Sequence, residues 1–570
     1  MPFPGFSLRA TAAAAAALAL LASCANFPMF RPDPNAQAPR LEGFGQSAIA
    51  ITTRSERARE LFNQGVLQAY AFNEVEAVRL FKSALTFDWD CAMCAWGVAW
   101  QLGPNINDPG RERVPEALDY VNYALARLDG ATPRERALVQ ALAVRYGHAS
   151  QERETAPYLA KTCSPREDGE GTTPLDIAYA DSMRKLADAY PQDADILSLY
   201  AEAEMIATEG DHNWDKTGKP VGRIGEVADR LERLLPSHQD HTGLNHYMIH
   251  IVDAQPVAAR GVAAADRLGR LAPGSPHLVH MPSHIYVNVG RFADAARVNE
   301  QSVGADVTLA QAQKAQGFEV SKDWRGHDLH FLWYASLMAG RGELALRTAD
   351  EMAEFTAKSN TTYGEYVRSL RLLSLARMEE WDRVLAEPMP RGDKGIAAMW
   401  YEQSRGIAQA RLGQIEAAQE SLMRLLAVGE RVRSESAGNT PRERNVRSMF
   451  DYAEASLQAQ LAASRRSFDV AEAYQRKAMA AAEKVDSREP PLLADGTRLA
   501  LGDIQARAGR WKDSEATYRE ALGEHPGSGW ALRGLQRALA AQGRTAEAAQ
   551  TAHALDASWA EASTHLRRPA

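Results

Sequence analysis

The chain has 570 residues, of which 24% are charged and 45% hydrophobic, and its formal net charge is −8 at pH 7. Since the charges of both signs are interspersed, this balance argues against binding of nucleic acid, whose phosphate backbone demands a basic face. The length exceeds one ordinary compact core, so we expect several domains or a repeat architecture.

The first 23 residues predict a signal peptide. Arg9 supplies a positive charge, and residues 10–22 form an apolar run of Ala and Leu that ends at Ser23-Cys24. This run is too short for a mature transmembrane helix, which takes about 20 apolar residues. The small residues before Cys24 resemble the lipobox of bacterial lipoproteins, in which the Cys is lipidated and becomes the new N-terminus. An ordinary secretory signal with an incidental Cys is the alternative.

A lipidated Cys24 would place the protein in the bacterial cell envelope. The next residue is Ala25, where an Asp would resemble the signal for inner-membrane retention, so we expect an outer-membrane anchor facing the periplasm. Residues 24–46 are rich in Pro, Asn and Gln and predict a flexible tether. Because no other stretch is apolar enough to cross a bilayer, the membrane would be reached through the lipid anchor only.

Two cysteines form a C-x-x-C motif, Cys91 and Cys94, and Cys163 stands alone. In an oxidising envelope, a disulfide between Cys91 and Cys94 is expected. A redox pair is less favoured because no βαβ pattern surrounds the motif, and metal ligation by the pair stays open. Ala95 follows Cys94, where haem attachment would need His.

Apolar residues recur at helical spacing almost throughout, and no strand is predicted. Residues 58–91 show a 34-residue pattern of small and aromatic residues that returns at 399–432 and 495–528. The residues that carry it are Gly65, Ala77, Phe81 and Ala84, then Gly406, Gly413 and Ala418, then Gly502, Gly509, Tyr518, Ala521 and Pro526. This pattern resembles the tetratricopeptide repeat, in which small residues let helix A of a hairpin approach helix B.

The resemblance implies an all-α fold, a right-handed superhelix of about ten to twelve helical hairpins with helices A lining a concave groove. It can be narrowed to a family of bacterial tetratricopeptide proteins without an established activity, through residues 61–81, 91–107, 243–254, 277–295 and 527–539. Pro, Gly and charge cluster at 388–394. We therefore expect an N-terminal superhelix with a His-rich groove at 47–387 and a C-terminal array at 388–570, with a polar inserted loop at 163–173.

Nine of the fourteen histidines fall between His238 and His330. In the repeat register, seven of them occupy positions 2, 5 and 9 of helix A in successive hairpins, which form one face of a helix. Under the resemblance, that face points into the groove. Neighbouring helices pack about 8–10 Å apart, so imidazoles of adjacent repeats can meet on one ion.

The predicted metal ligands are two H-x-x-x-H pairs on consecutive helices: His246, His250, His280 and His284. A possible extension, up to a second ion, takes in His277, His327, His330 and, as a partner that orients an imidazole, Asp253. Imidazole nitrogens suit zinc, copper, nickel or iron, and zinc and copper are the favoured ions. A hydrogen-bonded structural cluster and contact with a peptide are the alternatives.

The sequence contains no G-x-S-x-G, no H-E-x-x-H, no phosphate loop and no dinucleotide fingerprint, so no catalytic residue is assigned. We expect a binding scaffold whose His-lined groove holds a transition metal or a metal-bearing ligand and whose partner is a protein or peptide. A purely protein-binding adaptor in envelope assembly or transport, with structural histidines, is the alternative. A metal-dependent enzyme is the third interpretation.

Overall fold

The computed structural model describes residues 30–107, 111–148, 173–208, 213–320, 323–435, 438, 440–485, 489–493, 496–563 and 566. The predicted signal peptide, Cys24, Cys163 and nearly all of the predicted loop at 163–173 lie outside the described residues. Among the residues described, no helix has both the length and the apolar character that crossing a bilayer requires.

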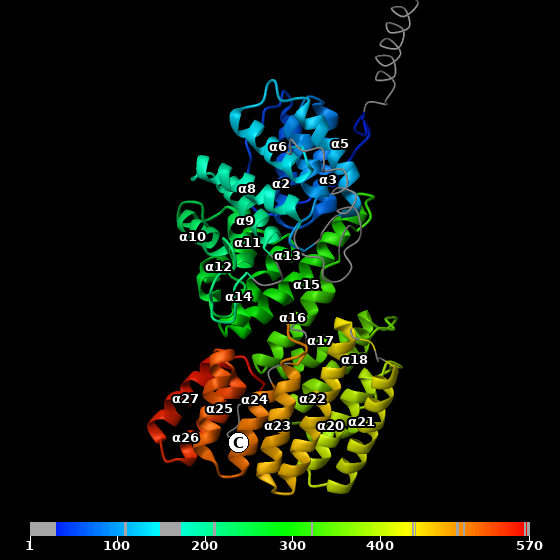
Figure 1. Ribbon diagram of the computed structural model, residues 1–570, viewed down its shortest axis with the longest axis vertical. Helices are drawn as coiled ribbons and strands as arrows, with labels where there is room; N and C mark the ends of the chain where they lie inside the picture. Colours follow the sequence, from blue (N-terminus) through cyan, green and yellow to red (C-terminus); the bar gives the residue numbers. More distant parts are fainter. Residues whose placement is uncertain are drawn as a thin grey trace, which may run out of the picture. The chain divides into compact units, whose positions relative to one another are not determined.

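Helices make up the regular structure of this part of the chain, with two isolated β-bridges and no strand among the described residues (Figure 1). Up to residue 145 they are α2 (Glu56–Tyr70), α3 (Glu74–Phe87), α4 (Ala92–Leu102), η2 (Arg111–Arg113), α5 (Val114–Leu125) and α6 (Pro133–Arg145). From residue 174 to 355 they are α8 (Pro174–Ala189), α9 (Ala194–Ala207), α10 (Ile224–Leu234), η3 (Leu235–Ser237), α11 (Thr242–Ile251), η4 (Ala258–Gly261), α12 (Val262–Leu271), α13 (Pro276–His280), α14 (Pro282–Asn288), α15 (Phe292–Ala315), α16 (Arg325–Met338) and α17 (Gly342–Phe355). Beyond that they are α18 (Thr362–Arg377), α19 (Trp381–Ala386), α20 (Ile396–Arg411), α21 (Ile415–Glu435), α22 (Pro441–Ser464), α23 (Phe468–Ala482), α24 (Gly496–Arg507), α25 (Trp511–Glu524), α26 (Gly529–Ala541) and α27 (Thr545–Ser558).

The chain divides into two compact units. Unit 1 takes its described residues from Met1–Ala38, Ile49–Val66 and Glu74–Asp168. Unit 2 takes its described residues from Pro39–Ala48, Leu67–Asn73 and Gly169–Ala570. The predicted start of a C-terminal array at residue 388 falls inside unit 2, in the segment between α19 and α20, and stays a prediction.

Several helices begin where the sequence satisfies their free backbone N–H groups. At α6, α8 and α22 a Thr caps the helix and a Pro occupies the first turn. In α6, the Thr132 side chain accepts a hydrogen bond from the Glu135 N–H, and the Glu135 carboxylate accepts one from the Thr132 N–H. Such reciprocal capping stabilises a helix start because it pairs donors that the helix itself leaves free.

The close packing expected of the repeat is present in both units. In unit 1, a Cβ placed at Gly65 or at Gly97 would lie 2.6 Å from the ring of Phe81, so that ring fills the space that the two glycines leave. In unit 2, the ring of Tyr518 lies in the same way between Gly502 and Gly534. One bulky residue of helix B therefore joins helix A of its own hairpin to helix A of the next. The predicted all-α class and the tetratricopeptide-type hairpin are confirmed.

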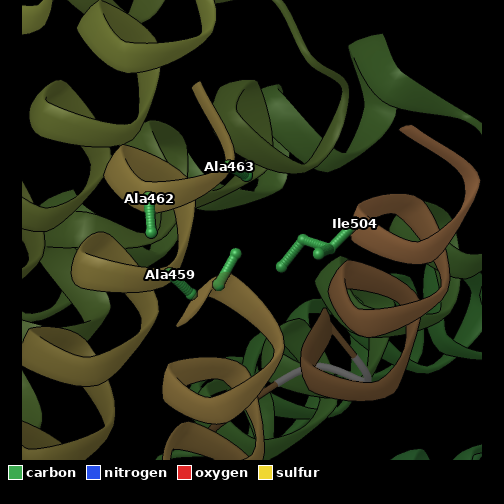
Figure 2. Close-up of a cluster of buried hydrophobic side chains, with 5 residues drawn as sticks. Ala459, Ala462, Ala463 and Ile504 are labelled. Carbon is green, nitrogen blue, oxygen red and sulfur yellow. The ribbon is translucent and has the colours of Figure 1, made fainter. Parts of the chain in front are cut away.

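Small residues also join hairpins in the second half of unit 2. Helices α20 to α27, coloured from yellow-green to red, follow one another side by side (Figure 1). Figure 2 shows Ala459, Ala462 and Ala463 of α22 facing Ile504 of α24. Ala471 of α23 completes this buried cluster. Because alanine side chains are short, the three helix backbones approach closely and bury Ile504 completely.

The end of the chain packs back onto α16 and α17. The indole N–H groups of Trp530 and Trp559 donate to the backbone carbonyls of Leu337 and Met338 at 3.0 and 3.1 Å. Close by, the Ser563 N–H donates to the Gly340 carbonyl at 2.9 Å. The series of neighbouring helices from α16 to α27 therefore closes on itself within unit 2, because its last residues contact its first helix.

The described part of the expected tether packs against helices instead of extending from them. In unit 1, the ring of Phe30 lies edge-on to Tyr120, with centroids 4.8 Å apart. In unit 2, the Gln46 N–H donates to Thr242 Oγ1 at 3.0 Å. The Gly43 carbonyl accepts from the Gly274 N–H at 2.7 Å. These hydrogen bonds and the buried ring of Phe44 fix residues 39–46.

Candidate metal centre

The histidines of the predicted stripe come from the first helices of three consecutive hairpins of unit 2. Helix α11 carries His246 and His250 one turn apart, and it begins where the ring of His241 accepts a hydrogen bond from the Leu244 N–H. The first helix of the next hairpin is interrupted, because Pro282 has no N–H to donate to the preceding turn. It therefore splits into α13, which ends at His280, and α14, which carries His284.

The first histidine triad consists of His246, His250 and His277. The Nε2 atom of His246 lies 3.0 Å from the Nε2 atoms of both other rings. Two aromatic rings wall the triad: Phe72 lies 4.6 to 5.4 Å from all three imidazoles, and Trp324 stacks on His277 at 4.4 Å. Phe72 has a φ of 52°, a left-handed conformation that aromatic residues seldom adopt. Phe72 lies two residues after the end of α2, and its backbone conformation places the phenyl ring against the first triad.

The second histidine triad consists of His280, His284 and His327. The Nε2 atoms of His280 and His284 lie 2.9 Å apart. His327, on α16, lies with its ring centroid 4.8 Å from that of His280, and one nitrogen from each ring falls within 4.8 Å of the others. His284 also belongs to a group with Asp253 and Glu489.

The Nδ1 side of the second triad is held by oxygen atoms. Asn299 donates its amide N–H to the Ala295 carbonyl at 2.8 Å, which orients its Oδ1 toward His280 Nδ1 at 2.6 Å. His284 Nδ1 lies 2.7 Å from Asp253 Oδ2 and 3.0 Å from Glu489 Oε2. In His280, Nδ1 is therefore the donor, and in His284, Nδ1 faces the two carboxylates. A histidine whose Nδ1–H is bound to an oxygen presents Nε2 as the metal-binding atom.

Burial sets the charge of most of these rings. It lowers the pKa of His246 to about 3 and holds the pKa values of His250 and His280 well below the ordinary 6.5. These three imidazoles are neutral at pH 7, which is the form that binds metal. Burial also disfavours the charged form of His284, but the carboxylates of Asp253 and Glu489 outweigh it and raise the pKa of His284 to about 10.

In the first triad, hydrogen bonds among the three rings do not satisfy every Nε2 atom. Each Nε2 offers either one N–H or one lone pair in the ring plane. His246 Nε2 faces two other Nε2 atoms at 3.0 Å and can pair with only one of them. In the second triad, His280 and His284 both turn Nδ1 toward oxygen atoms, so their Nε2 atoms face each other at 2.9 Å. Two lone pairs would meet there unless a proton or a cation lies between them. Tetrahedral zinc holds its nitrogen ligands about 3.3 Å apart, close to these separations.

The structure divides the four predicted ligands between two groups of histidines. His246 and His250 gather with His277, while His280 and His284 gather with His327. Asp253 lies against His284, as expected of a partner that orients an imidazole. His330 joins neither triad, because its two ring nitrogens face the hydroxyls of Tyr366 and Tyr363 at 3.3 Å. The assignment of these residues as metal ligands stays a prediction.

The two triads share one register. In the first triad, His246 and His250 occupy positions 5 and 9 of one helix A, and His277 occupies position 2 of helix A in the next hairpin. In the second triad, His280, His284 and His327 occupy the same three positions, shifted by one hairpin. Sequence analysis found the stripe but missed Asn299 and Glu489. Asn299 lies on α15, and Glu489 on the segment before α24, where no histidine spacing points to them.

The C-x-x-C motif belongs to unit 1. Cys91 and Cys94 are joined by a disulfide and are fully buried. Cys91 also caps α4, because its sulfur accepts a hydrogen bond from the Cys94 N–H. The bond closes the first turn of α4.

No protein-family model matches this chain, and no curated protein matches it. Among solved structures, it is similar to the tetratricopeptide domain of P58(IPK), with 12% identity over 59% of this chain and 89% of the other and a TM-score of 0.19. It is also similar to yeast Tom70, with 10% identity, coverage of 88% and 91%, and a TM-score of 0.22. A third similar structure is the Cut9–Hcn1 hetero-tetramer of APC/C, with 11% identity, coverage of 90% and 89%, and a TM-score of 0.24. Because these scores are low, the fold assignment rests on the packing around Phe81 and Tyr518.

Proposed function

We propose that this protein is a helical-hairpin scaffold that binds transition metal ions at the first and second histidine triads. The observation that carries the proposal is the recurrence of the triad. Twice in succession, two imidazoles from one helix A and a third from helix A of the next hairpin bring one nitrogen each to within 4.8 Å of one another. A structural histidine needs one partner for each ring nitrogen, and a metal ion explains why three rings converge.

Zinc and copper are the ions we expect. Both accept neutral imidazole nitrogen, and the ligand groups contain no cysteine, which would favour softer ions. Each triad supplies three nitrogens, which leaves a fourth position for water, for a carboxylate such as Asp253 or Glu489, or for a ligand. The scaffold would then present the metal, or a metal-bearing ligand, to a protein or peptide partner.

We further propose that the protein acts in a bacterial envelope, anchored in the outer membrane through lipid on Cys24. The support is the sequence of residues 1–24 alone. The proposed disulfide-permissive compartment agrees with the bond between Cys91 and Cys94, since disulfides persist where the surroundings are oxidising.

Metal content of purified protein tests the main proposal. Protein prepared without an affinity tag, offered zinc, copper, nickel and iron and then desalted, should retain at least about one equivalent of one of them. The double variant His250→Ala with His284→Ala should retain none. The control variant His525→Ala with His553→Ala changes two histidines outside both triads and should retain the wild-type amount.

The melting temperature provides the second measurement. Metal should raise the melting temperature of wild type and of the control but not that of the triad variant, because a ligand stabilises the state that binds it. Retention below about half an equivalent of every metal, with a triad variant that melts like wild type, rejects the proposal. The protein-binding adaptor with structural histidines would then be the better interpretation.

A further inference from the structure

A partly open cavity of about 290 Å³ is lined by residues of helices α16 to α26. Its walls come mainly from the first helix of each successive hairpin, α16, α18, α20, α22, α24 and α26. The closure through Trp530 and Leu337 completes the wall. A volume of this size lies at the lower end of the range of small-molecule sites.

Large aromatic side chains form the apolar part of the wall. Trp333, Trp400, Trp530 and Tyr518 line the cavity, and each is at most 5% exposed. Rings held rigid by packing offer contact area at a low cost in side-chain entropy. Such a wall fits a planar apolar body.

The same wall carries an excess of positive charge. Four guanidinium groups line the cavity against two carboxylates, Glu379 and Asp503. Asp503 is shared between Arg411 at 2.6 Å and Arg537 at 3.1 Å. Arg533 lies 3.9 Å from Glu379, and the guanidinium groups of Arg377 and Arg533 lie 5.0 and 5.1 Å from the centre of the Trp530 ring. A cleft with this balance of charge attracts an anion.

Three buried polar atoms in the lining have no hydrogen-bond partner among the described residues. They are Trp400 Nε1, Ser404 Oγ and Gln475 Oε1. The three side chains are 2%, 1% and 1% exposed. Since burying an unpaired polar group is costly, these atoms indicate a bound molecule with polar groups of its own.

We propose that this cavity binds a small organic anion with a planar apolar body and a single acidic group. The aromatic wall contacts the body, the arginines neutralise the acidic group, and Trp400 Nε1 donates to a polar atom of the ligand. The site is separate from the histidine triads, and the inference does not depend on the metal.

Matched pairs of probes test this site. The probes are 2-naphthoate, indole-3-acetate and 1-naphthalenesulfonate, each compared with its neutral amide by calorimetry on metal-stripped and on metal-loaded protein. At least one anion should bind with a Kd below about 1 mM and about tenfold more tightly than its amide. Added salt should weaken binding of the anion but not of the amide.

Variants of the wall locate the binding. Arg533→Gln should remove most of the preference for the anion, while Arg533→Lys should retain part of it. Trp400→Phe keeps an aromatic ring without the N–H and should weaken binding severalfold. Arg476→Gln, on the exposed side of α23, is the matched control and should bind as wild type does. If Arg533→Gln does not fold by circular dichroism, Arg377→Gln replaces it.

Three results overturn the inference: no probe binds below about 1 mM, each anion and its amide bind equally, or Arg533→Gln retains the full preference. Equal binding by metal-stripped and metal-loaded protein supports this site whatever the outcome for the triads.

Discussion

His280 and His284 face each other through their Nε2 atoms at 2.9 Å, while both rings turn Nδ1 toward side-chain oxygen atoms, of Asn299 and of Asp253. This arrangement leaves one position between the rings for a positive charge. A proton occupies it readily, because Asp253 and Glu489 favour the charged form of His284. A metal ion bound there would take the place of that proton.

We therefore predict that Asp253→Asn weakens metal binding at the second triad by about 10- to 100-fold, the usual effect of removing a carboxylate that orients an imidazole ligand. Glu489→Gln should have a smaller effect, since Glu489 lies farther from His284 and its side chain is 55% exposed. Competition with a metal-chelating dye measures both affinities. Asp240→Asn, on the exposed turn before α11, is the control. Equal affinity in Asp253→Asn and wild type would contradict the prediction.

Because His330 is buried, we predict that the folded protein loses stability in acid. Burial lowers the pKa of His330 to about 3, whereas the unfolded chain has the ordinary value of 6.5. Between these values the unfolded state binds a proton that the folded state does not, so stability falls as pH drops below about 6.5. The slope for one group is at most about 1.4 kcal/mol per pH unit.

The variant His330→Phe should therefore show a flatter dependence of melting temperature on pH between 4 and 7, measured with chelator present. His553→Ala changes an exposed histidine and should follow the wild-type curve. Parallel curves for wild type and His330→Phe would show that His330 does not contribute.

The hairpin fold could be predicted because its determinants are local. Gly65 and Phe81, like Gly502 and Tyr518, stand at fixed spacing within one hairpin, and their contact needs only two neighbouring helices. The packing of residues 39–46 could not be predicted. It depends on hydrogen bonds of Gly43 and Gln46 to helices about 200 residues away, which composition does not reveal.

The histidine face could be predicted for the same reason, but the grouping within it could not. Equal spacing in the sequence suggested that His246 would meet His280. In the structure, His246 meets His277, because the groups form diagonally between neighbouring helices. Glu489 reaches His284 from a segment about 200 residues farther along the chain, and only the folded structure brings them together.

The packing around Tyr518 predicts opposite effects of two similar substitutions. A Cβ at Gly534 would lie 2.2 Å from the Tyr518 ring, so Gly534→Ala should destabilise the protein by about 1–3 kcal/mol. Gly523 lies in the helix that carries Tyr518, and a Cβ there would meet nothing within 4 Å. Gly523→Ala should therefore stabilise the protein by about 0.5–1 kcal/mol through helix propensity. Denaturant unfolding measures both, and equal shifts would contradict the tetratricopeptide-type packing.

The proposed anchor gives a prediction for the cell. Wild-type protein should sediment with membranes and incorporate labelled lipid, whereas Cys24→Ala should accumulate as unprocessed precursor or in the soluble fraction. Cys163→Ala changes another cysteine and should fractionate as wild type. Identical fractionation of Cys24→Ala and wild type, with no lipid label on either, would favour an ordinary secretory signal.

The last prediction separates the two triads from a single site of four histidines. If the triads bind metal, His277→Ala should lose the first ion and His327→Ala the second, and the double variant should lose both. A single site of His246, His250, His280 and His284 would leave the metal content of both variants near wild type.

His330→Ala is the matched control, because His330 lies on the same helix as His327 and contacts tyrosines. Titration with zinc or copper, read as equivalents bound after desalting, measures each step. Full retention by His277→Ala and His327→Ala would contradict the triads, even if His250→Ala with His284→Ala binds no metal. Loss of one equivalent from each variant would support two sites related by the repeat itself, since positions 5 and 9 of one hairpin then bind together with position 2 of the next.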